Sequence, residues 1–398
     1  MAAVSFPQRF AGLPEYAFPR LRTLLDRHKP GGAPVAMTIG EPQHEFPGWV
    51  PQVLAQAAES FGRYPVNEGT PELLDAIRGW LSRRYGVTMA RDNLMVLNGT
   101  REGLYNGAMA LCPEEKAGQR PLILMPNPFY QVYMIAAISV GAEPVFLPAT
   151  ADTGHLPELS AIAADVLDQT AIFYLCSPAN PQGAVADESY WRQLIGLAEK
   201  HDFRIFADEC YSEIWRDSAP VGILQVAQAM GADPERIVAF HSLSKRSNLP
   251  GLRSGFVASG SANIAAMRQL RSYAGAPLPL PLQKVAERAW GDEGHVDDNR
   301  ALYQVKYRIA DEILGDVPGY APPPAGFFLW LPVPDGEAAA LRLWRETGVR
   351  VLPGAYLGND AGGVNPGHGF IRVAMVAPAQ DLQRGLRALR DCLYGSEG

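Results

Sequence analysis

The chain has 398 residues, of which 47% are hydrophobic and 19% are charged, values typical of a globular protein with a large core. Its 42 acidic and 35 basic residues give a formal charge of -7 without any basic and aromatic cluster, which argues against a nucleic-acid or anionic-membrane partner. The four cysteines form no CxxC pair and no apolar run reaches about 18 residues, which argues against a zinc or other metal site, a secreted disulfide framework and a membrane span.

The N-terminal residues come first in chain order. Residues 1–7 lack a basic segment followed by an apolar core, so we expect no secretory leader and a cytoplasmic protein. Residues 1–45 are rich in proline and glycine, and we expect them to pack with a second, smaller domain. The composition changes after residue 274, where the chain becomes rich in proline. The sequence therefore predicts a large domain over residues 46–290 and a C-terminal domain over residues 291–398.

Short apolar runs alternate with stretches of helical period through the middle of the chain. Residues 71–85 place their apolar side chains on one helical stripe, with Pro71 at the start and Gly86 beyond the end. Asp187 is a suitable N-cap for a second helix. Continuous apolar runs predict strands that are covered on both faces, over residues 94–97, 122–125, 171–175, 204–207 and 237–240. This alternation predicts an α/β domain with a mainly parallel sheet covered by helices.

Each of the five predicted strands is followed by a polar cluster. In parallel α/β sheets, ligands bind at the carboxyl edge, so we expect these clusters to meet at one site. They comprise residues 98–101, 127–130, 177–181, 208–211 and 242–245.

The first and last of these clusters suit a phosphate group. Backbone N–H groups at a helix start, next to a glycine that permits close approach, favour an anion, and hydroxyl and guanidinium groups can bind the same anion. An isolated Asn-Gly-Thr sequence is more often a simple turn. The candidates for phosphate binding are Gly99, Thr100, Arg101, Ser242, Ser244 and Arg253.

Lys245 and Asp208 carry the chemistry of the predicted site. Lys245 follows an apolar run and two serines, and desolvation together with the nearby Arg253 would lower its pKa towards that of a nucleophilic amine. Burial would raise the pKa of Asp208 unless a cation pairs with it, and a protonated pyridine nitrogen is such a partner. A surface lysine and a capping aspartate are the alternatives. Together the two residues predict a site for pyridoxal 5'-phosphate (PLP).

The remaining candidates surround that pair. Tyr211 and Asn180 can hydrogen-bond the phenolic oxygen of the cofactor ring, and Tyr130 offers a face for stacking on it. Arg372 stands between apolar residues on a predicted strand. If it faces inward, it needs a carboxylate, which an amino-acid substrate supplies; the alternative is an edge-strand arginine on the surface.

These motifs resemble those of the fold-type I, class I/II PLP-dependent aminotransferases over nearly the whole chain. Within that family, residues 125–131, 241–256 and 363–367 are most similar to enzymes that act on N-succinyldiaminopimelate in lysine biosynthesis. Gln182 and Ala179 depart from the usual pattern, in which Thr and Gly are common. The matching pieces are residues 39–42, Tyr64 with Gly69, residues 98–100, 128–130, 180–181, 208–211 and 242–245, Arg253 and Arg372.

The resemblance implies a large domain with a mainly parallel sheet, a smaller α+β domain built from both termini, and a homodimer with shared active sites. It implies that Tyr64 of a neighbouring copy binds the PLP phosphate, and that Gly40 and Asn180 lie near the substrate carboxylate held by Arg372. Lys245, Asp208 and Tyr211 are then the catalytic residues.

The reaction implied is transfer of an amino group between glutamate or 2-oxoglutarate and an amino or 2-oxo acid, with N-succinyl-L,L-diaminopimelate as the expected substrate. Arg20 and Arg22 are candidates for its distal group. Alternatives are an aminotransferase for aspartate, alanine or aromatic acids, and a PLP-dependent β-lyase. A regulator with an aminotransferase-like domain is a further alternative, but it would need a DNA-binding module ahead of Gly40, and the acidic charge disfavours it.

Overall fold

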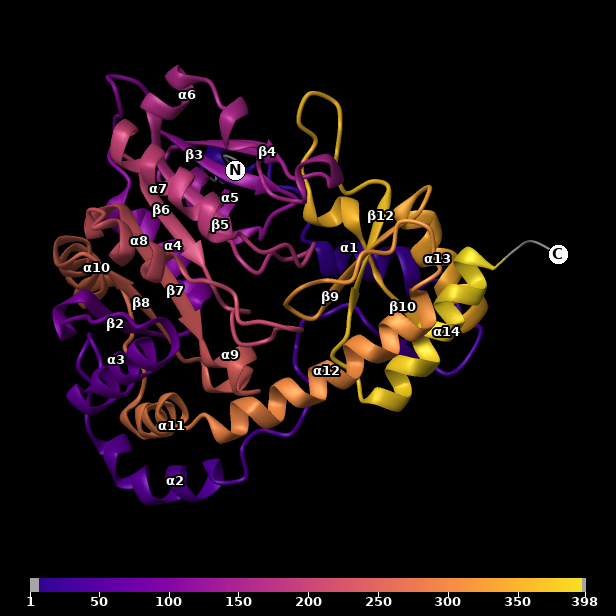
Figure 1. Cartoon of the computed structure of the whole chain (residues 1–398), viewed down its shortest axis with the longest axis horizontal. Helices are drawn as coiled ribbons and strands as arrows, with labels where there is room; N and C mark the ends of the chain where they lie inside the picture. The colour runs from indigo at the N-terminus through magenta and orange to yellow at the C-terminus, as the bar shows by residue number, and fades with distance from the viewer. Residues whose placement is uncertain (1–6, 396–398) are drawn as a thin grey trace, which may run out of the picture.

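The computed structural model describes residues 7–395, so the first six residues of the predicted segment 1–45 and the last three of the predicted domain 291–398 lie outside the described residues. Figure 1 shows two bodies of unequal size, the larger built on a seven-stranded sheet and the smaller on a three-stranded sheet. Helix α12 (Gly294–Leu314) runs from one body to the other. No helix among the described residues has the length and apolar content of a bilayer span.

The larger sheet has the strand order β2-β8-β7-β6-β5-β3-β4. All pairings between β7 and β4 are parallel, and β8 alone runs against its neighbours β2 and β7. The five strands predicted from the sequence are therefore confirmed, and all of them point the same way. The strands are β2 (Leu94–Leu97), β3 (Leu122–Asn127), β4 (Glu143–Pro148), β5 (Thr170–Cys176), β6 (Arg204–Asp208), β7 (Ile237–Ser242) and β8 (Gly255–Ser259).

Two strands of this sheet, β4 and β8, were not identified from the sequence. β4 contains Pro144 and Pro148, which usually argue against a strand, but it lies at the sheet edge, where proline is tolerated. β8 is antiparallel to β7 and follows it without a long crossover helix, so the alternation of strands and helices does not reveal it.

Helices cover both faces of this sheet, which confirms the predicted α/β class. Residues of β5 alternate between the two layers, because Phe173 and Leu175 pack with α3, α7, α8 and α11 while Ile172 and Tyr174 pack with α4, α5 and α10. The helices are α2 (Val50–Ala57), α3 (Pro71–Tyr85), α4 (Thr100–Leu111), α5 (Val132–Ser139), α6 (Ala164–Gln169), α7 (Glu188–His201), α8 (Ile223–Met230), α9 (Leu243–Arg246), α10 (Ser261–Ala274) and α11 (Leu280–Gly291).

The predicted helix ends are also confirmed where the sequence specified them. Helix α3 covers Pro71–Tyr85 and ends at Gly86, whose φ of 67° is in the left-handed region. The Asp187 side chain accepts a hydrogen bond of 2.7 Å from the Tyr190 N–H at the start of α7. A cap of this type stabilises a helix by about 1 kcal/mol.

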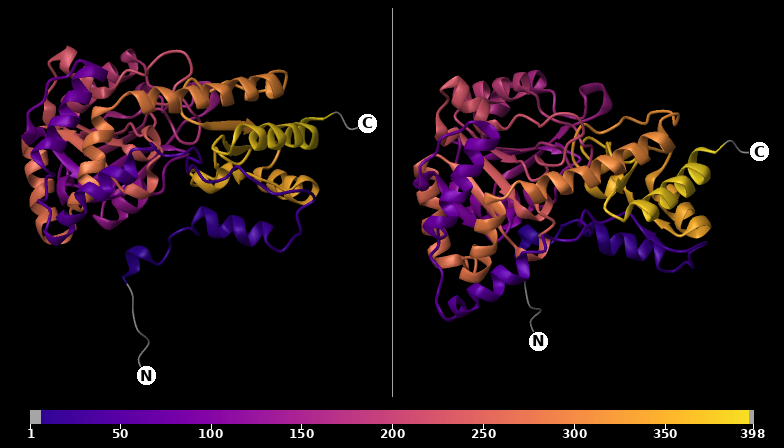
Figure 2. Two further views of the ribbon diagram at one scale, coloured as in Figure 1. Left: turned by 90° about the horizontal axis from the view of Figure 1, so that it is seen from below. Right: turned by 60° about the horizontal axis from the view of Figure 1, so that its bottom comes forward.

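The smaller body combines both ends of the chain, as the resemblance implied. The α1 residues Ala17, Leu21 and Leu25 pack against Trp330 and Trp344, and β1 pairs with β10. Figure 2 shows this N-terminal segment along the outside of the smaller body. The elements are α1 (Ala17–Leu25), β1 (Val35–Ala36), β9 (Phe328–Pro332), α13 (Gly336–Thr347), β10 (Val349–Arg350), β11 (Leu352–Pro353), β12 (Phe370–Ala374) and α14 (Ala379–Tyr394).

The domain boundaries at residues 45 and 290 stay a prediction. The tyrosines Tyr303 and Tyr307 of α12 belong to the core of the smaller body, whereas Asn299, nearer the start of the same helix, contacts the α9 region of the larger one. One continuous helix therefore belongs to both bodies, and a boundary near its start divides elements that are packed together.

Candidate active site

The polar clusters that follow the parallel strands meet in one pocket between the two bodies, with a volume of about 490 Å³. Convergence is expected, since the strands end at the same sheet edge. Two predicted residues, Tyr64 and Gly99, are not among the lining side chains. The lining includes the other twelve, Gly40, Thr100, Arg101, Tyr130, Asn180, Asp208, Tyr211, Ser242, Ser244, Lys245, Arg253 and Arg372.

Lys245 lies on the short helix α9, directly after β7. Ser242 caps this helix by accepting a hydrogen bond of 3.1 Å from the Ser244 N–H, which sets the direction of the chain. The Lys245 ammonium donates to the Gly40 carbonyl. Burial lowers the pKa of Lys245 to about 8, against the opposing influence of Cys210 and Glu41. An amine with this pKa is partly unprotonated near neutral pH, as attack on a carbonyl requires.

Asp208 ends β6 with a side chain that is 4% exposed. One carboxylate oxygen accepts a hydrogen bond of 2.8 Å from the Tyr133 hydroxyl and the other accepts one of 3.4 Å from the Cys210 N–H. It forms no ion pair within residues 7–395, and burial raises its pKa. A buried carboxylate in this state is suited to accept a hydrogen bond from a positively charged N–H group.

Arg372 faces inward from β12, so the structure decides between the two orientations that the sequence left open. Its side chain donates to the Asn180 side-chain oxygen at 2.9 Å and to the Thr38 carbonyl at 2.6 Å. The guanidinium lies 4.3 Å from the Phe328 ring centroid, and its Nε has no partner in the described part of the chain. Burial lowers the pKa of Arg372 to about 10, so it remains a cation at neutral pH.

An anion can bind where β2 passes into α4. Gly99 has a φ of 82°, and a Cβ at this position would collide with the Arg253 guanidinium. Because Gly99 lacks this carbon, there is room for the Arg253 guanidinium and for the first N–H groups of α4, which begins at Thr100. The Arg253 guanidinium also donates to the Pro250 carbonyl at 2.9 Å. N–H groups and an arginine together favour a phosphate.

Aromatic side chains form the walls of the pocket. The Arg101 Nε donates to the Tyr130 hydroxyl at 2.5 Å, which fixes both side chains relative to each other. Tyr211 meets the rings of Phe327 and Phe328 edge-on, with centroids 5.3 and 5.7 Å away. Burial holds the pKa of Tyr211 well above its ordinary value, so its hydroxyl keeps a proton to donate.

The segment around Gly40 closes the side of the pocket nearest the smaller body. A Cβ at Gly40 would lie 2.7 Å from Cζ of Phe328 and 3.1 Å from Cε2 of Phe327. Only glycine therefore lets this segment approach closely enough for its carbonyl to accept from Lys245, while Thr38 two residues earlier accepts from Arg372.

Tyr64 lies in the loop before α3, and its side chain is 101% exposed. Within a single chain it does not reach the pocket. Its predicted contact with a phosphate in a neighbouring copy stays a prediction.

Several contact residues were missed in the sequence analysis. Tyr133 is on α5, three residues after Tyr130, and nothing in its local sequence indicates a bond to Asp208. Cys210 contacts Thr100 through a 3.0 Å interaction between Sγ and Oγ1. Tyr16 comes from the N-terminal segment, and Phe328 from the start of β9. All four residues lie far in sequence from the side chains or pocket that they contact, so only the tertiary structure brings them together.

The family pattern described as "Aminotransferase class I and II" matches residues 34–389. An LL-diaminopimelate aminotransferase of Dehalococcoides mccartyi is 32% identical over 393 residues, covering 96% of this chain and 97% of the relative. An aminotransferase structure from Neisseria meningitidis has a TM-score of 0.92 and 36% identity, with 96% of this chain and 99% of that chain covered.

A third similar protein carries a more specific description. A structure from Thermus thermophilus described as a probable N-succinyldiaminopimelate aminotransferase has a TM-score of 0.84 and 26% identity, with 95% of this chain and all of that chain covered. The family match spans most of the chain and the similar structures share both bodies. The chain therefore belongs to the class I and II aminotransferases and is a PLP-dependent transaminase.

Proposed function

We propose that transamination takes place in this pocket, with Lys245 as the catalytic lysine and a diaminopimelate derivative as the preferred amino acid. One observation carries the proposal: an amine of lowered pKa, a buried carboxylate without an ion pair in the described chain, and an inward-facing arginine surround the same pocket. Groups with shifted pKa values in one cleft are typical of catalytic sites.

The residues fit PLP, which when bound supplies an aldehyde for covalent attachment and a protonated ring that takes up electrons. We assign the ring N–H to Asp208, because its carboxylate is buried and forms no ion pair in the described chain, where Lys245 is the only charged group that acts to lower its raised pKa. The Lys245 amine, with a pKa of about 8, can attach the aldehyde and afterwards carry a proton to and from the substrate carbon.

Other side chains orient the reacting groups. The Tyr211 hydroxyl can donate to the phenolic oxygen, and the Asn180 amide can do the same through Nδ2 because its oxygen already accepts from Arg372. Tyr130 provides a stacking face. Arg372 and Gly40 are placed for the substrate carboxylate. The anion-binding residues proposed for the phosphate are Gly99, Thr100, Ser242, Ser244 and Arg253.

Arg101 supports a substrate with an acidic distal group. Its guanidinium lines the pocket and its hydrogen bond goes to the neutral Tyr130 hydroxyl, so its charge is available to a carboxylate. Arg20 is less suitable, because it pairs with Glu337 at 2.6 Å. Neither Arg20 nor Arg22 is among the residues that line the pocket, so we propose Arg101 for distal recognition in place of both, and no longer for the phosphate.

Two related substrates remain, and each is favoured by a different observation. The motifs of residues 125–131 and 241–256 favour N-succinyl-L,L-diaminopimelate, as does the Thermus thermophilus structure by its description. The Dehalococcoides mccartyi relatives, 31–32% identical, are described as LL-diaminopimelate aminotransferases. Both compounds place a second acidic group far from the reacting amine.

Substrate profiling tests this proposal. We expect kcat/KM for one of the two diaminopimelate substrates to exceed that for alanine or phenylalanine by at least ~30-fold, since a buried charge pair at the distal carboxylate is worth about 2 kcal/mol or more. The measurement is the single-turnover half-reaction of each amino acid with the PLP-loaded enzyme. Equal rates for short substrates would contradict the preference, and release of pyruvate and ammonia from cysteine would indicate a β-lyase.

We also propose that the active enzyme is a homodimer in which Tyr64 binds the phosphate in the neighbouring copy. Its support is the exposure of Phe61, Tyr64 and Val66, at 59%, 101% and 51%, on one segment of the surface. An apolar segment of this kind is suited to cover a second copy of the chain.

Mixed dimers test the shared site. Tyr64→Ala should weaken PLP binding by about 10- to 100-fold, the cost of a hydrogen bond to a charged group. When Tyr64→Ala and Lys245→Ala chains are mixed and reassociated, one site of each mixed dimer regains both residues, so activity should reappear at a PLP concentration too low to load the Tyr64→Ala sites. If Tyr64 served its own chain, no mixture would recover activity.

We further propose a cytoplasmic location. All four cysteines, Cys112, Cys176, Cys210 and Cys392, are free thiols, which supports a reducing compartment. Cell fractionation tests this, and recovery of the protein from an exported fraction would contradict it.

A further inference from the structure

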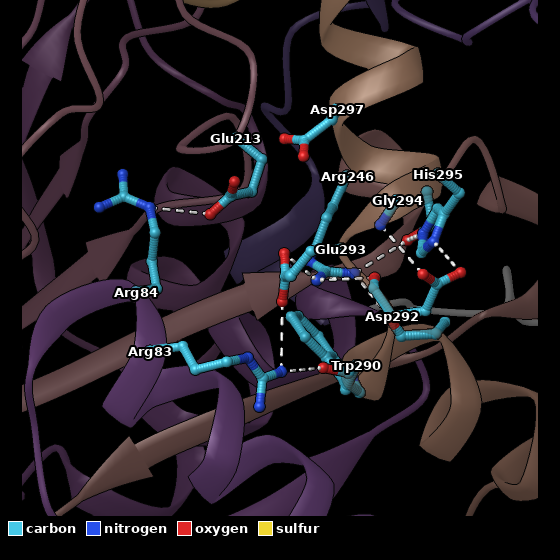
Figure 3. Close-up of polar contacts among 12 residues, drawn as sticks. Arg83, Arg84, Glu213, Arg246, Trp290, Asp292, Glu293, Gly294, His295 and Asp297 are labelled. Carbon is cyan, nitrogen blue, oxygen red and sulfur yellow. Dashed lines mark hydrogen bonds and ion pairs between the residues drawn. The ribbon is translucent and has the colours of Figure 1, made fainter.

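The short helix α9, which carries Lys245, is contacted by residues at the junction of α11 and α12. Arg246 is 2% exposed, and its guanidinium donates to the Ala289 carbonyl at 2.6 Å. It also donates to Glu293 at 2.9 Å (Figure 3). The next residue, Ser247, shares a 2.8 Å hydrogen bond with Nε2 of His295. The chain just beyond Lys245 is therefore fixed at two successive residues.

Asn299 adds a third and more direct contact. It lies four residues after His295 on α12, hence on the same face of the helix, and is 4% exposed. Its Nδ2 donates to the Lys245 carbonyl at 3.2 Å and to the Arg246 carbonyl at 3.3 Å. Carbonyls only accept, so the orientation of the Asn299 amide is determined by its partners.

These two carbonyls need a partner from outside their own helix. α9 has only four residues, and the last carbonyls of a helix have no intrahelical donor. Buried carbonyls without a donor cost about 1–3 kcal/mol each. Asn299 satisfies both and so limits the conformations open to the backbone of Lys245.

The other side of the Asn299 amide reaches the segment that contacts the Lys245 amine. Its Oδ1 accepts from the Asn248 side chain at 2.9 Å and from Nδ1 of His44 at 3.1 Å. His44 follows Gly40 by four residues, and the Gly40 carbonyl accepts from the Lys245 ammonium. Asn299 therefore links the backbone of Lys245 to the segment that contacts the end of its side chain.

The groups around His44 indicate which proton it carries. Burial, and next the Lys306 ammonium, lower the pKa of His44, while its bond to Asn299 opposes them. His44 also packs on Tyr303, with ring centroids 4.7 Å apart. Because the Asn299 oxygen can only accept, the neutral His44 ring carries its proton on Nδ1.

We propose that Asn299 is a positioning residue for Lys245: it holds the lysine backbone and the Gly40 segment in one fixed arrangement, from a helix that belongs to both bodies. The inference rests on the proposed function, since it takes Lys245 as the catalytic lysine. Asn299 does not touch the pocket, so its influence on the reaction passes through Lys245.

The variant Asn299→Asp tests this with almost no change in volume. An ionised aspartate keeps an oxygen that accepts from His44 and Asn248 but cannot donate to the two α9 carbonyls. The matched control is Asn263→Asp on α10, because Asn263 is 2% exposed, donates through Nδ2 at 2.8 and 3.0 Å and accepts from Arg204 at 2.9 Å. It lies outside the pocket lining, and none of these hydrogen bonds involves α9.

We expect Asn299→Asp to lower kcat by roughly 10- to 100-fold with KM changed less than about threefold, because a small misplacement of a reacting group can cost ~100-fold. Hydrogen exchange of the amides of residues 243–248 should accelerate in Asn299→Asp and not in Asn263→Asp. After borohydride reduction and peptide mass analysis, less PLP should be attached to residue 245. Equal losses of kcat in both variants, with unchanged exchange at 243–248, would overturn the proposal.

Two further measurements keep the test decisive. If Asn299→Asp does not fold, His44→Phe keeps an aromatic ring against Tyr303 but removes one hydrogen bond to Asn299, and it should accelerate exchange at 243–248 by a smaller factor. Unchanged exchange in that variant would count against the link. The same experiment distinguishes failure of the proposed function from failure of this inference. If Lys245 were not the catalytic lysine, borohydride would attach no PLP to it even in the unchanged enzyme.

Discussion

Replacement of Lys245 by alanine is expected to lower kcat by at least ~10,000-fold, the upper range for a positioned proton-transfer group, because covalent attachment is lost as well. The alanine cannot attach to the cofactor aldehyde or carry a proton to the substrate carbon. The measurements are kcat by coupled assay and the PLP attached to residue 245 after borohydride reduction.

A matched control separates this loss from a general effect of removing a lysine. Lys200→Ala removes an exposed lysine from the last turn of α7 and should leave kcat unchanged. A Lys245→Ala enzyme that transaminates at the normal rate would refute the assignment.

The lowered pKa of Lys245 adds a pH dependence to the same prediction. Attachment of PLP to the apoenzyme should accelerate as pH rises through about 8, where the buried amine loses its proton. The contribution of Lys245 to the stability of the apoenzyme also rises with pH. Between about 8 and the ordinary value of 10.5, the unfolded chain binds the proton and the folded chain does not, so the free energy of unfolding of the apoenzyme gains from this residue as pH rises.

Replacement of Arg372 by leucine is expected to lower kcat/KM by ~30- to ~4,000-fold, because truncating one partner of a buried, hydrogen-bonded charge pair costs about 2–5 kcal/mol. The substrate carboxylate would then enter a buried site without its cation. The sharpest measurement compares an amino acid with the amine that lacks its carboxylate, since Arg372→Leu should abolish the preference between them.

Arg372→Lys serves as the control for charge alone. A lysine keeps the cation but not the planar fork that can bind a carboxylate and the Asn180 oxygen together, so its kcat/KM should lie between those of the leucine variant and the unchanged enzyme. Retention of full preference for the carboxylated substrate in Arg372→Leu would show that another group binds it.

Much of the fold was predictable because its signals are local. Helix α3 has its proline, its apolar stripe and its terminal glycine within one stretch of sequence, and the structure has the same bounds. The edge strand β4 contains prolines that contradict the local signal for a strand, and only its place at the end of the sheet makes them acceptable.

In the candidate site, too, some contacts were predictable from local sequence and others were not. Asp208 ends the buried strand β6 and Lys245 follows the buried strand β7, and parallel strands carry such residues to one edge, so their convergence followed from the sequence. The hydroxyl of Tyr133 on Asp208 and the amide of Asn299 on the Lys245 carbonyl come from other helices, at separations of 75 and 54 residues, without any local motif.

The amino-acid sequence by itself determined the alternating elements, the parallel sheet and the chemistry at its carboxyl edge, because apolar periodicity, caps and strand-end motifs all act over a few residues. Only the tertiary structure decided that Arg372 faces inward, that Gly40 meets the Lys245 amine and that α12 supports the lysine from behind. Those contacts join segments distant in the chain, and their geometry depends on how the two bodies pack.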